Sequence, residues 1–133
     1  MGGWTEDPRL ASAGLLAGRL LLATIFVHEG VAKLGNYAGA VAYTKAFGVP
    51  VDLLPVAIAV ELGCGVLIAL GLYARAAALV LAGFCLFTAA TFHAKFGDRN
   101  QLLHFEKNLA MAGGLLVLAV SGPGRFRLTR QQR

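Results

Sequence analysis

A single acidic residue, Glu61, stands near the middle of the almost wholly apolar stretch 53–72. A helix rises about 1.5 Å per residue, so this stretch would be close to 30 Å long, roughly the hydrocarbon thickness of a bilayer. A carboxylate at that depth costs about 2.5 to 3.5 kcal/mol on insertion scales, so it needs a partner or a function. Arg19 interrupts the first apolar stretch, 10–27, at a depth from which its long side chain could reach Glu61. Because an unpaired buried charge costs more than a paired one, we expect an Arg19–Glu61 ion pair, direct or through water, that either fixes helix register or serves proton transfer.

Other polar side chains fall near the ends of the apolar stretches. His93, Lys107 and Asn108 could reach the same half of a helical bundle as Glu61. Lysines at these places, including Lys33, are also typical of anchors at the membrane interface. The pattern therefore predicts a polar pocket with some of these residues in it, and interface anchoring is the alternative for the lysines.

The three histidines of the chain define a second candidate site. His28, His93 and His104 all map to one side of the predicted bundle, with Glu29 and Glu106 nearby. Imidazole and carboxylate together suit several transition metals. Their spacing matches no compact ligand motif, so a metal at these histidines is the less favoured interpretation and we assign no metal ligand.

Composition restricts the class of protein. The chain has 133 residues, of which 57% are hydrophobic and only 14% charged, whereas a typical soluble domain is about a quarter charged. The net charge is +5, and its basic end is better explained as a membrane topology signal than as a nucleic-acid patch. Cys64 and Cys85 lie in apolar stretches and are expected to be packing residues, with a redox pair as the alternative. The basic end, 122–133, holds four arginines, Arg125, Arg127, Arg130 and Arg133.

The apolar stretches predict one all-α domain over 1–133, an integral membrane four-helix bundle. A short interfacial helix is expected between the first and second spans, where tyrosines would sit at headgroup level. The fourth stretch reaches span length only if Phe105–Asn108 are helical and Lys107 extends its ammonium outward. Four spans place both termini on one side, and the arginine-rich tail predicts that this side is the cytoplasm of a bacterial inner membrane. The predicted spans are 10–33, 53–73, 75–94 and 105–121.

The chain resembles the DoxX family of small bacterial four-span membrane proteins. The resemblance rests on the order and spacing of five segments, and it extends from about Leu16 to Leu128. It draws attention to Arg19, His28, Gly30, Lys33, Glu61, His93, Lys107 and Asn108. Glu29 departs from the expected pattern, since a more neutral residue is expected there, and it could pair with Lys33 one helical turn away. The segments are GRLLLATIFVHEGVAKL, VELGCGVLIALGLYAR, TFHAKF, FEKNLAMAGGLL and SGPGRFRL.

The resemblance implies a function more weakly than a fold. DoxX-like proteins are associated with membrane oxidoreductase systems, among them thiosulfate:quinone oxidoreductase and complexes that defend against oxidative stress. By resemblance the chain would be the membrane subunit of a quinone- or thiol-linked oxidoreductase complex, in contact with the lipid bilayer, a redox-enzyme partner and, as a further option, copies of itself. The resemblance gives a proton relay or polar pocket to Glu61, Arg19, His93 and Asn108, and cofactor binding, with quinone as the candidate, to His28, Lys33 and Lys107.

Two other functions stay open from the sequence. The chain could be a non-catalytic anchor that holds a soluble partner at the membrane through its basic tail. It could also be a carrier for a small solute or a metal. A nucleic-acid partner is not expected.

Overall fold

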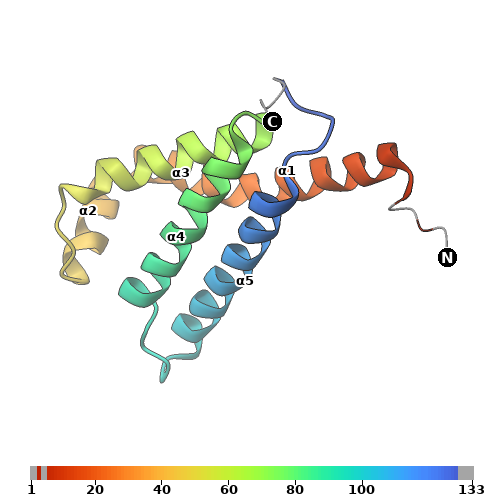
Figure 1. Ribbon diagram of the computed structural model, residues 1–133. Helices are drawn as coiled ribbons and strands as arrows, with labels where there is room; N and C mark the ends of the chain where they lie inside the picture. The colour runs from red at the N-terminus through yellow and green to blue at the C-terminus, as the bar shows by residue number, and fades with distance from the viewer. Residues whose placement is uncertain (1–2, 4–5, 129–133) are drawn as a thin grey trace.

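The computed structural model describes residue 3 and residues 6–128, and in this part of the chain it is helical without strands (Figure 1). All helices except the second are long and apolar enough to cross a membrane. The predicted all-α membrane bundle is therefore confirmed, as is the short helix between the first two spans. The helices in chain order are α1 (Pro8–Gly35), α2 (Tyr37–Ala46), α3 (Leu53–Leu70), α4 (Ala74–Phe92) and α5 (Arg99–Ser121).

Local capping residues explain where α1 begins and where it gives way to α2. Pro8 occupies the first turn of α1, where its missing N–H costs nothing, and the Asp7 carboxylate accepts a hydrogen bond from the Arg9 N–H at 2.8 Å. Asn36 ends α1, and its side-chain oxygen then accepts from the Gly39 N–H at 3.1 Å to begin α2. One asparagine therefore serves two helices and fixes the sharp turn between them.

The helix that contains the fourth predicted span begins before Phe105. Asp98 caps α5, and its carboxylate accepts a hydrogen bond from the Asn100 N–H at 2.9 Å, so the helix begins at Arg99. The polar residues that follow the cap gave no apolar signal, although they are compatible with a helix. Because α5 begins at Arg99, Gln101 and His104 lie on the helix rather than on a loop.

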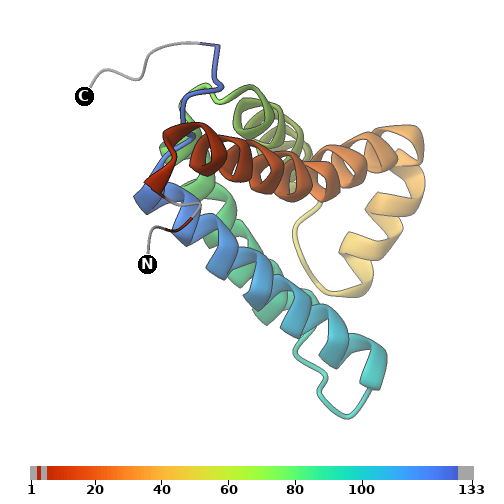
Figure 2. The same ribbon diagram turned by 90° about the vertical axis from the view of Figure 1, so that its right-hand side faces the viewer.

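The spans pack as two antiparallel pairs, α1 with α3 and α4 with α5. Figures 1 and 2 show the two pairs meeting at one end and diverging toward the other. The basal end is the end where they meet, and it holds the α3–α4 turn and residues 121–128. The open end holds α2 and residues 93–98. The fully buried residues Ile68, Leu81 and Leu115 lie toward the basal end, so most of the apolar core is there.

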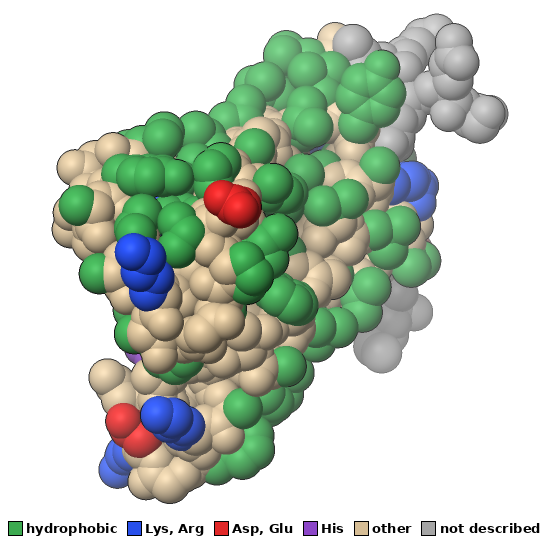
Figure 3. Space-filling view, turned by 90° about the vertical axis from the view of Figure 1, so that its left-hand side faces the viewer, with side chains coloured by type: hydrophobic (Ala, Val, Ile, Leu, Met, Phe, Trp, Pro, Cys, Tyr) green, Lys and Arg blue, Asp and Glu red, His purple; other side chains and the backbone are tan. Residues whose placement is uncertain are grey.

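The outward faces of the spans are apolar. Leu21 is 76% exposed and Val120 is 80% exposed, and Figure 3 shows a face with widespread apolar side chains and few charged ones. In water such a surface would be unstable, whereas lipid tails solvate it well. These faces are the ones that contact the bilayer.

Residues after α5 fold back over the basal end and tie three helices together. The Arg125 N–H donates to the Ser12 hydroxyl of α1 at 3.3 Å, and the Leu128 N–H donates to the Leu70 carbonyl of α3 at 3.1 Å. The Arg75 guanidinium donates to the Ala119 carbonyl at 2.9 Å, one of the α5 carbonyls that a helix end leaves without a partner. The basal end is thus held by polar bonds as well as by the core. Arg130 and Arg133 of the predicted basic tail lie outside the described residues.

Candidate functional site

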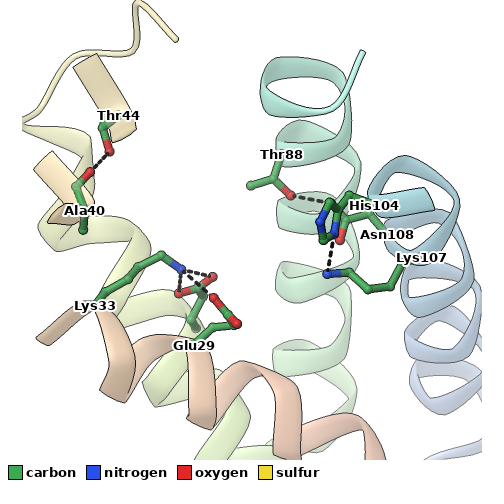
Figure 4. Close-up of polar contacts among 9 residues, drawn as sticks. Glu29, Lys33, Ala40, Thr44, Thr88, His104, Lys107 and Asn108 are labelled. Atoms are coloured by element: carbon green, nitrogen blue, oxygen red, sulfur yellow. Dashed lines mark hydrogen bonds and ion pairs between the residues drawn. The ribbon is translucent and has the colours of Figure 1, made fainter. Parts of the chain in front are cut away.

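A cavity of about 840 Å³ lies between the two helix pairs toward the open end, beside α2. Its volume falls within the usual range for small-molecule sites, roughly 300 to 1,000 Å³. Figure 4 shows its two walls, with polar side chains of α1 on one side and those of α4 and α5 on the other. Apolar side chains make up much of the lining, including Ile25, Phe26, Leu54, Val60, Phe84 and Met111.

The wall formed by α1 and α3 carries a buried ion pair. Glu61 of α3 is only 5% exposed, and Lys33 of α1 donates to both of its carboxylate oxygens, at 2.9 and 2.6 Å. Glu29 lies one helical turn before Lys33, with its carboxylate 3.9 Å from the ammonium. Lys33, predicted to bind a cofactor, thus holds the Glu61 carboxylate at the cavity lining, and the predicted link between Glu29 and Lys33 is confirmed.

The expected Arg19–Glu61 ion pair is wrong. Arg19 is 2% exposed at the basal end, where it donates to the Pro123 carbonyl and, at 3.2 Å, to the Ala69 carbonyl near the end of α3. Carbonyls in the last turn of a helix have no partner within the helix, and the planar guanidinium can serve two acceptors at once. Arg19 therefore fixes the basal end, while Lys33, about 21 Å further along α1 by helical rise, is the partner of Glu61.

Two glycines set the register that brings Lys33 opposite Glu61. Gly30 of α1 packs so closely on Leu62 that a Cβ at position 30 would lie 3.0 Å from the Leu62 Cβ. Gly65 of α3 packs in the same way against Phe26, where the distance would be 3.2 Å. Small residues at these two levels let the α1 and α3 backbones approach. The close approach keeps Lys33 and Glu61 within bonding distance.

The wall formed by α4 and α5 carries a row of polar side chains. His93 Nδ1 lies 2.7 Å from Gln101 Oε1, and the rings of His93 and His104 are 5.1 Å apart. The Lys107 ammonium lies 3.3 Å from His104 Nδ1. Because an ammonium can only donate, His104 accepts through Nδ1 and carries its own proton on Nε2.

A second polar contact lies deeper on the same wall. Asn108 is buried, and its amide nitrogen donates to the Thr88 hydroxyl at 3.3 Å, which joins α5 to α4. That bond does not engage the Asn108 carbonyl oxygen. Cys85, also buried, lines the cavity one turn before Thr88. The structure has both cysteines as free thiols.

Aromatic side chains bridge the two halves of the protein at the open end. The Tyr43 ring of α2 stacks on the Phe92 ring of α4 with the ring centroids 5.5 Å apart, and the Phe47 ring contacts the same Phe92 ring with a centroid distance of 5.2 Å. Partial burial raises the pKa of the Tyr43 hydroxyl. Tyr43 and Phe92 line the cavity.

The structure gathers most, though not all, of the residues singled out from the sequence. Glu61, Lys33, His93, Lys107 and Asn108 line the cavity. Arg19 lies at the basal end, and His28 is exposed outside the lining. His28 therefore does not lie with His93 and His104. In the described part of the chain no three His, Cys, Asp or Glu side chains are grouped so that they could hold a metal ion.

Several lining residues were not predicted. Gln101 and Thr88 have no signal in the sequence beyond their polarity. His104 was considered only as a metal ligand, although its position one turn before Lys107 on a helix could have indicated their contact. The aromatic contact of Tyr43 with Phe92 depends on where α2 lies, which no local pattern specifies.

Comparison with known proteins gives a consistent family. Residues 14–94 match the DoxX family. The chain is 41% identical over 122 residues to Inner membrane protein YqjF of Escherichia coli, covering 92% of this chain and 94% of that protein. It is 34% identical over 124 residues to Inner membrane protein YphA of the same organism, covering 88% of this chain and 89% of that protein. No solved structure gives a significant match. The chain therefore belongs to the DoxX family and is an inner-membrane protein.

Proposed function

We propose that this protein is the membrane subunit of an oxidoreductase complex and that it binds a quinone in the cavity between the two helix pairs. The observation that carries the proposal is the cavity itself, which combines apolar walls with a buried Lys33–Glu61 pair. Ligand sites of this kind join a largely apolar lining to a few convergent polar groups. A partner protein supplies the electrons in this proposal, and the chain supplies the binding site and the route for protons.

The residues present fit a quinone in size and in chemistry. Apolar side chains such as Phe84, Val60 and Met111 suit the tail and the ring faces, and donors on both walls suit the ring oxygens. Leu53 and Val56 line the cavity and are still 46% and 57% exposed, so the cavity opens sideways toward lipid. A long apolar tail can therefore remain partly in the bilayer.

A bound quinone would supply two-electron, two-proton chemistry between its oxidised and reduced forms. Glu61 is the residue suited to accept or return a proton, because its carboxylate lines the cavity and is held in one place by two hydrogen bonds from Lys33. Glu29 is half exposed and its carboxylate lies 3.9 Å from the Lys33 ammonium, so Lys33 links the buried Glu61 carboxylate to a second carboxylate that is partly open to its surroundings. Asn108 and His104 on the other wall would orient the ring through hydrogen bonds.

Filling the cavity is expected to abolish quinone binding. Ala57→Trp places a large ring on a lining position of α3, so the affinity of the detergent-purified protein for a tritiated short-chain ubiquinone should fall at least about tenfold. Ala59→Trp is the matched control, since Ala59 lies on the same helix, is exposed and does not line the cavity. Size-exclusion chromatography checks that both variants remain folded.

Equal quinone affinity in Ala57→Trp and wild type would contradict the proposal. Glu61→Gln separates binding from proton transfer, because the amide keeps the size of the carboxyl and cannot take up a proton at neutral pH. In the assembled complex this variant should retain quinone binding and lose turnover about a hundredfold. Normal turnover in Glu61→Gln would remove Glu61 from the proton route.

A further inference from the structure

Lys107 is a cavity-lining cation without an acidic partner. Both ion pairs found in the described residues belong to Lys33, and the Lys107 ammonium contacts only the neutral acceptor His104 Nδ1. Glu106, its neighbour in sequence, is exposed and does not line the cavity. The α1–α3 wall thus holds two carboxylates, Glu29 and Glu61, around its one lysine, whereas Lys107 on the α4–α5 wall has no carboxylate of the described residues within ion-pair distance.

Lys107 is exposed on α5 and lies at the cavity lining. By helical rise it lies about 21 Å from the end of α5 at Ser121 and about 12 Å from the start at Arg99. An anionic ligand in the cavity would give this ammonium the charged partner that the described side chains do not supply.

The neighbours of Lys107 are also hydrogen-bond donors. His104 accepts through Nδ1, so its Nε2 carries the proton and can donate. Gln101 uses Oε1 for His93, which leaves its amide N–H groups for another acceptor. Asn100 lines the same wall. This concentration of donors around an ammonium favours an oxygen atom that carries negative charge.

The rest of the cavity favours a hydrocarbon chain. The lining next to this wall includes Phe84, Phe87 and Met111, and Phe87 is 54% exposed where the cavity opens to its side. A chain in this space can leave the cavity between the helix pairs and continue among the lipids. One end of a ligand would thus meet cationic donors and the other would meet apolar side chains.

We propose that the cavity binds single-chain amphiphiles with an anionic oxygen headgroup, held by Lys107 and His104. A carboxylate and a phosphate both fit as the headgroup, since both offer the negative oxygen that these donors select. The inference goes beyond quinone binding because the ligand needs no redox group. It assigns Lys107 the recognition of headgroup charge, which Lys33 cannot perform while it is bound to Glu61.

The test compares two probes with the same chain and different headgroups, a spin-labelled stearic acid and its methyl ester. Electron paramagnetic resonance on the purified full-length protein in detergent measures the immobilised fraction of each probe. The wild type should bind the acid at least about tenfold more tightly than the ester, and Lys107→Met should remove that difference while leaving ester binding unchanged. Lys107→Arg should retain most of the preference, because it keeps the charge.

Lys95→Met is the matched control, since Lys95 is exposed at the open end and does not line the cavity. Octadecyl phosphate and acetate, used as competitors, separate the sources of the anion. Competition by octadecyl phosphate would show that the site accepts either headgroup. Competition by acetate at equal concentration would show that the hydrocarbon chain is irrelevant and would overturn the proposal. Equal affinity for acid and ester in the wild type, or equal losses in Lys107→Met and Lys95→Met, would also overturn it. Stearate binding without quinone binding would leave this inference standing and remove the quinone proposal. Quinone binding without stearate binding would remove this inference and leave the quinone proposal standing.

Discussion

Lys33→Met is expected to lower the free energy of unfolding by about 3 to 5 kcal/mol, because it leaves a buried carboxylate without its partner. Glu61 is 5% exposed, and Lys33 supplies hydrogen bonds to both of its oxygens. Methionine fills a similar volume without charge, so the loss comes from the unpaired Glu61. Unfolding in mixed detergent micelles with increasing sodium dodecyl sulfate, followed by circular dichroism, measures the change.

The double variant Lys33→Met with Glu61→Leu should recover most of that loss, since apolar replacement of a whole buried ion pair is often nearly neutral. Lys45→Met is the control for removing a lysine, because Lys45 is exposed on α2. If Lys33→Met lowers the free energy of unfolding no more than Lys45→Met does, the Lys33–Glu61 ion pair does not stabilise the fold. If the double variant is as unstable as Lys33→Met, the loss does not arise from an unpaired Glu61.

Arg19→Met is expected to loosen the basal end and to lower the free energy of unfolding by about 2 to 4 kcal/mol. The substitution leaves the Ala69 and Pro123 carbonyls without their shared donor in a site where Arg19 itself is 2% exposed. Hydrogen exchange should become faster at the Leu128 amide, which bonds to the Leu70 carbonyl in the same region.

Arg19→Lys should restore only part of that stability, since an ammonium lacks the planar fork that reaches two carbonyls. Arg9→Met is the control, because Arg9 is exposed in the first turn of α1 and its role in capping uses only the backbone N–H. Unchanged exchange at Leu128 in Arg19→Met would mean that Arg19 does not hold the residues after α5 in place.

The helices could be predicted because each depends on local information. Span length follows from the apolar stretches, and Pro8 and Asn36 mark boundaries through capping chemistry that operates within a few residues. The start of α5 was missed because Asp98 caps a polar segment whose helical character has no apolar periodicity to reveal it. The apolar stretch 53–72 identified Glu61, and the positions of Lys33 and Lys107 together with the family resemblance drew attention to those lysines, but neither gave their contacts.

The contacts of the site could not be predicted, because they depend on register and on the angle between helix pairs. Depth alone allowed Glu61 to meet Arg19, whereas the close packing of Gly30 on Leu62 places Lys33 there instead. The sequence presents Arg19 as a charge in need of a counter-charge, yet its guanidinium donates to the Ala69 carbonyl, which has no partner within α3 because the helix ends there. The cavity exists because the two helix pairs diverge, and no stretch of sequence encodes that divergence by itself.

The inward and outward assignment of the basal and open ends also stays a prediction. The arginines near the basal end favour a cytoplasmic location for both termini. On that orientation the cavity, with Glu61 and Lys107, opens away from the cytoplasm.

The central claim is that the cavity between the helix pairs holds a quinone, and photolabelling tests it most directly. A quinone with a photoreactive azido group is irradiated with the purified protein, and the labelled peptides are identified by mass spectrometry. We predict adducts at cavity-lining positions such as Val60 and Met111, suppressed by excess ubiquinone. Labelling that ubiquinone does not suppress, or that is confined to lipid-facing positions such as Leu21 and Val117, would contradict the account.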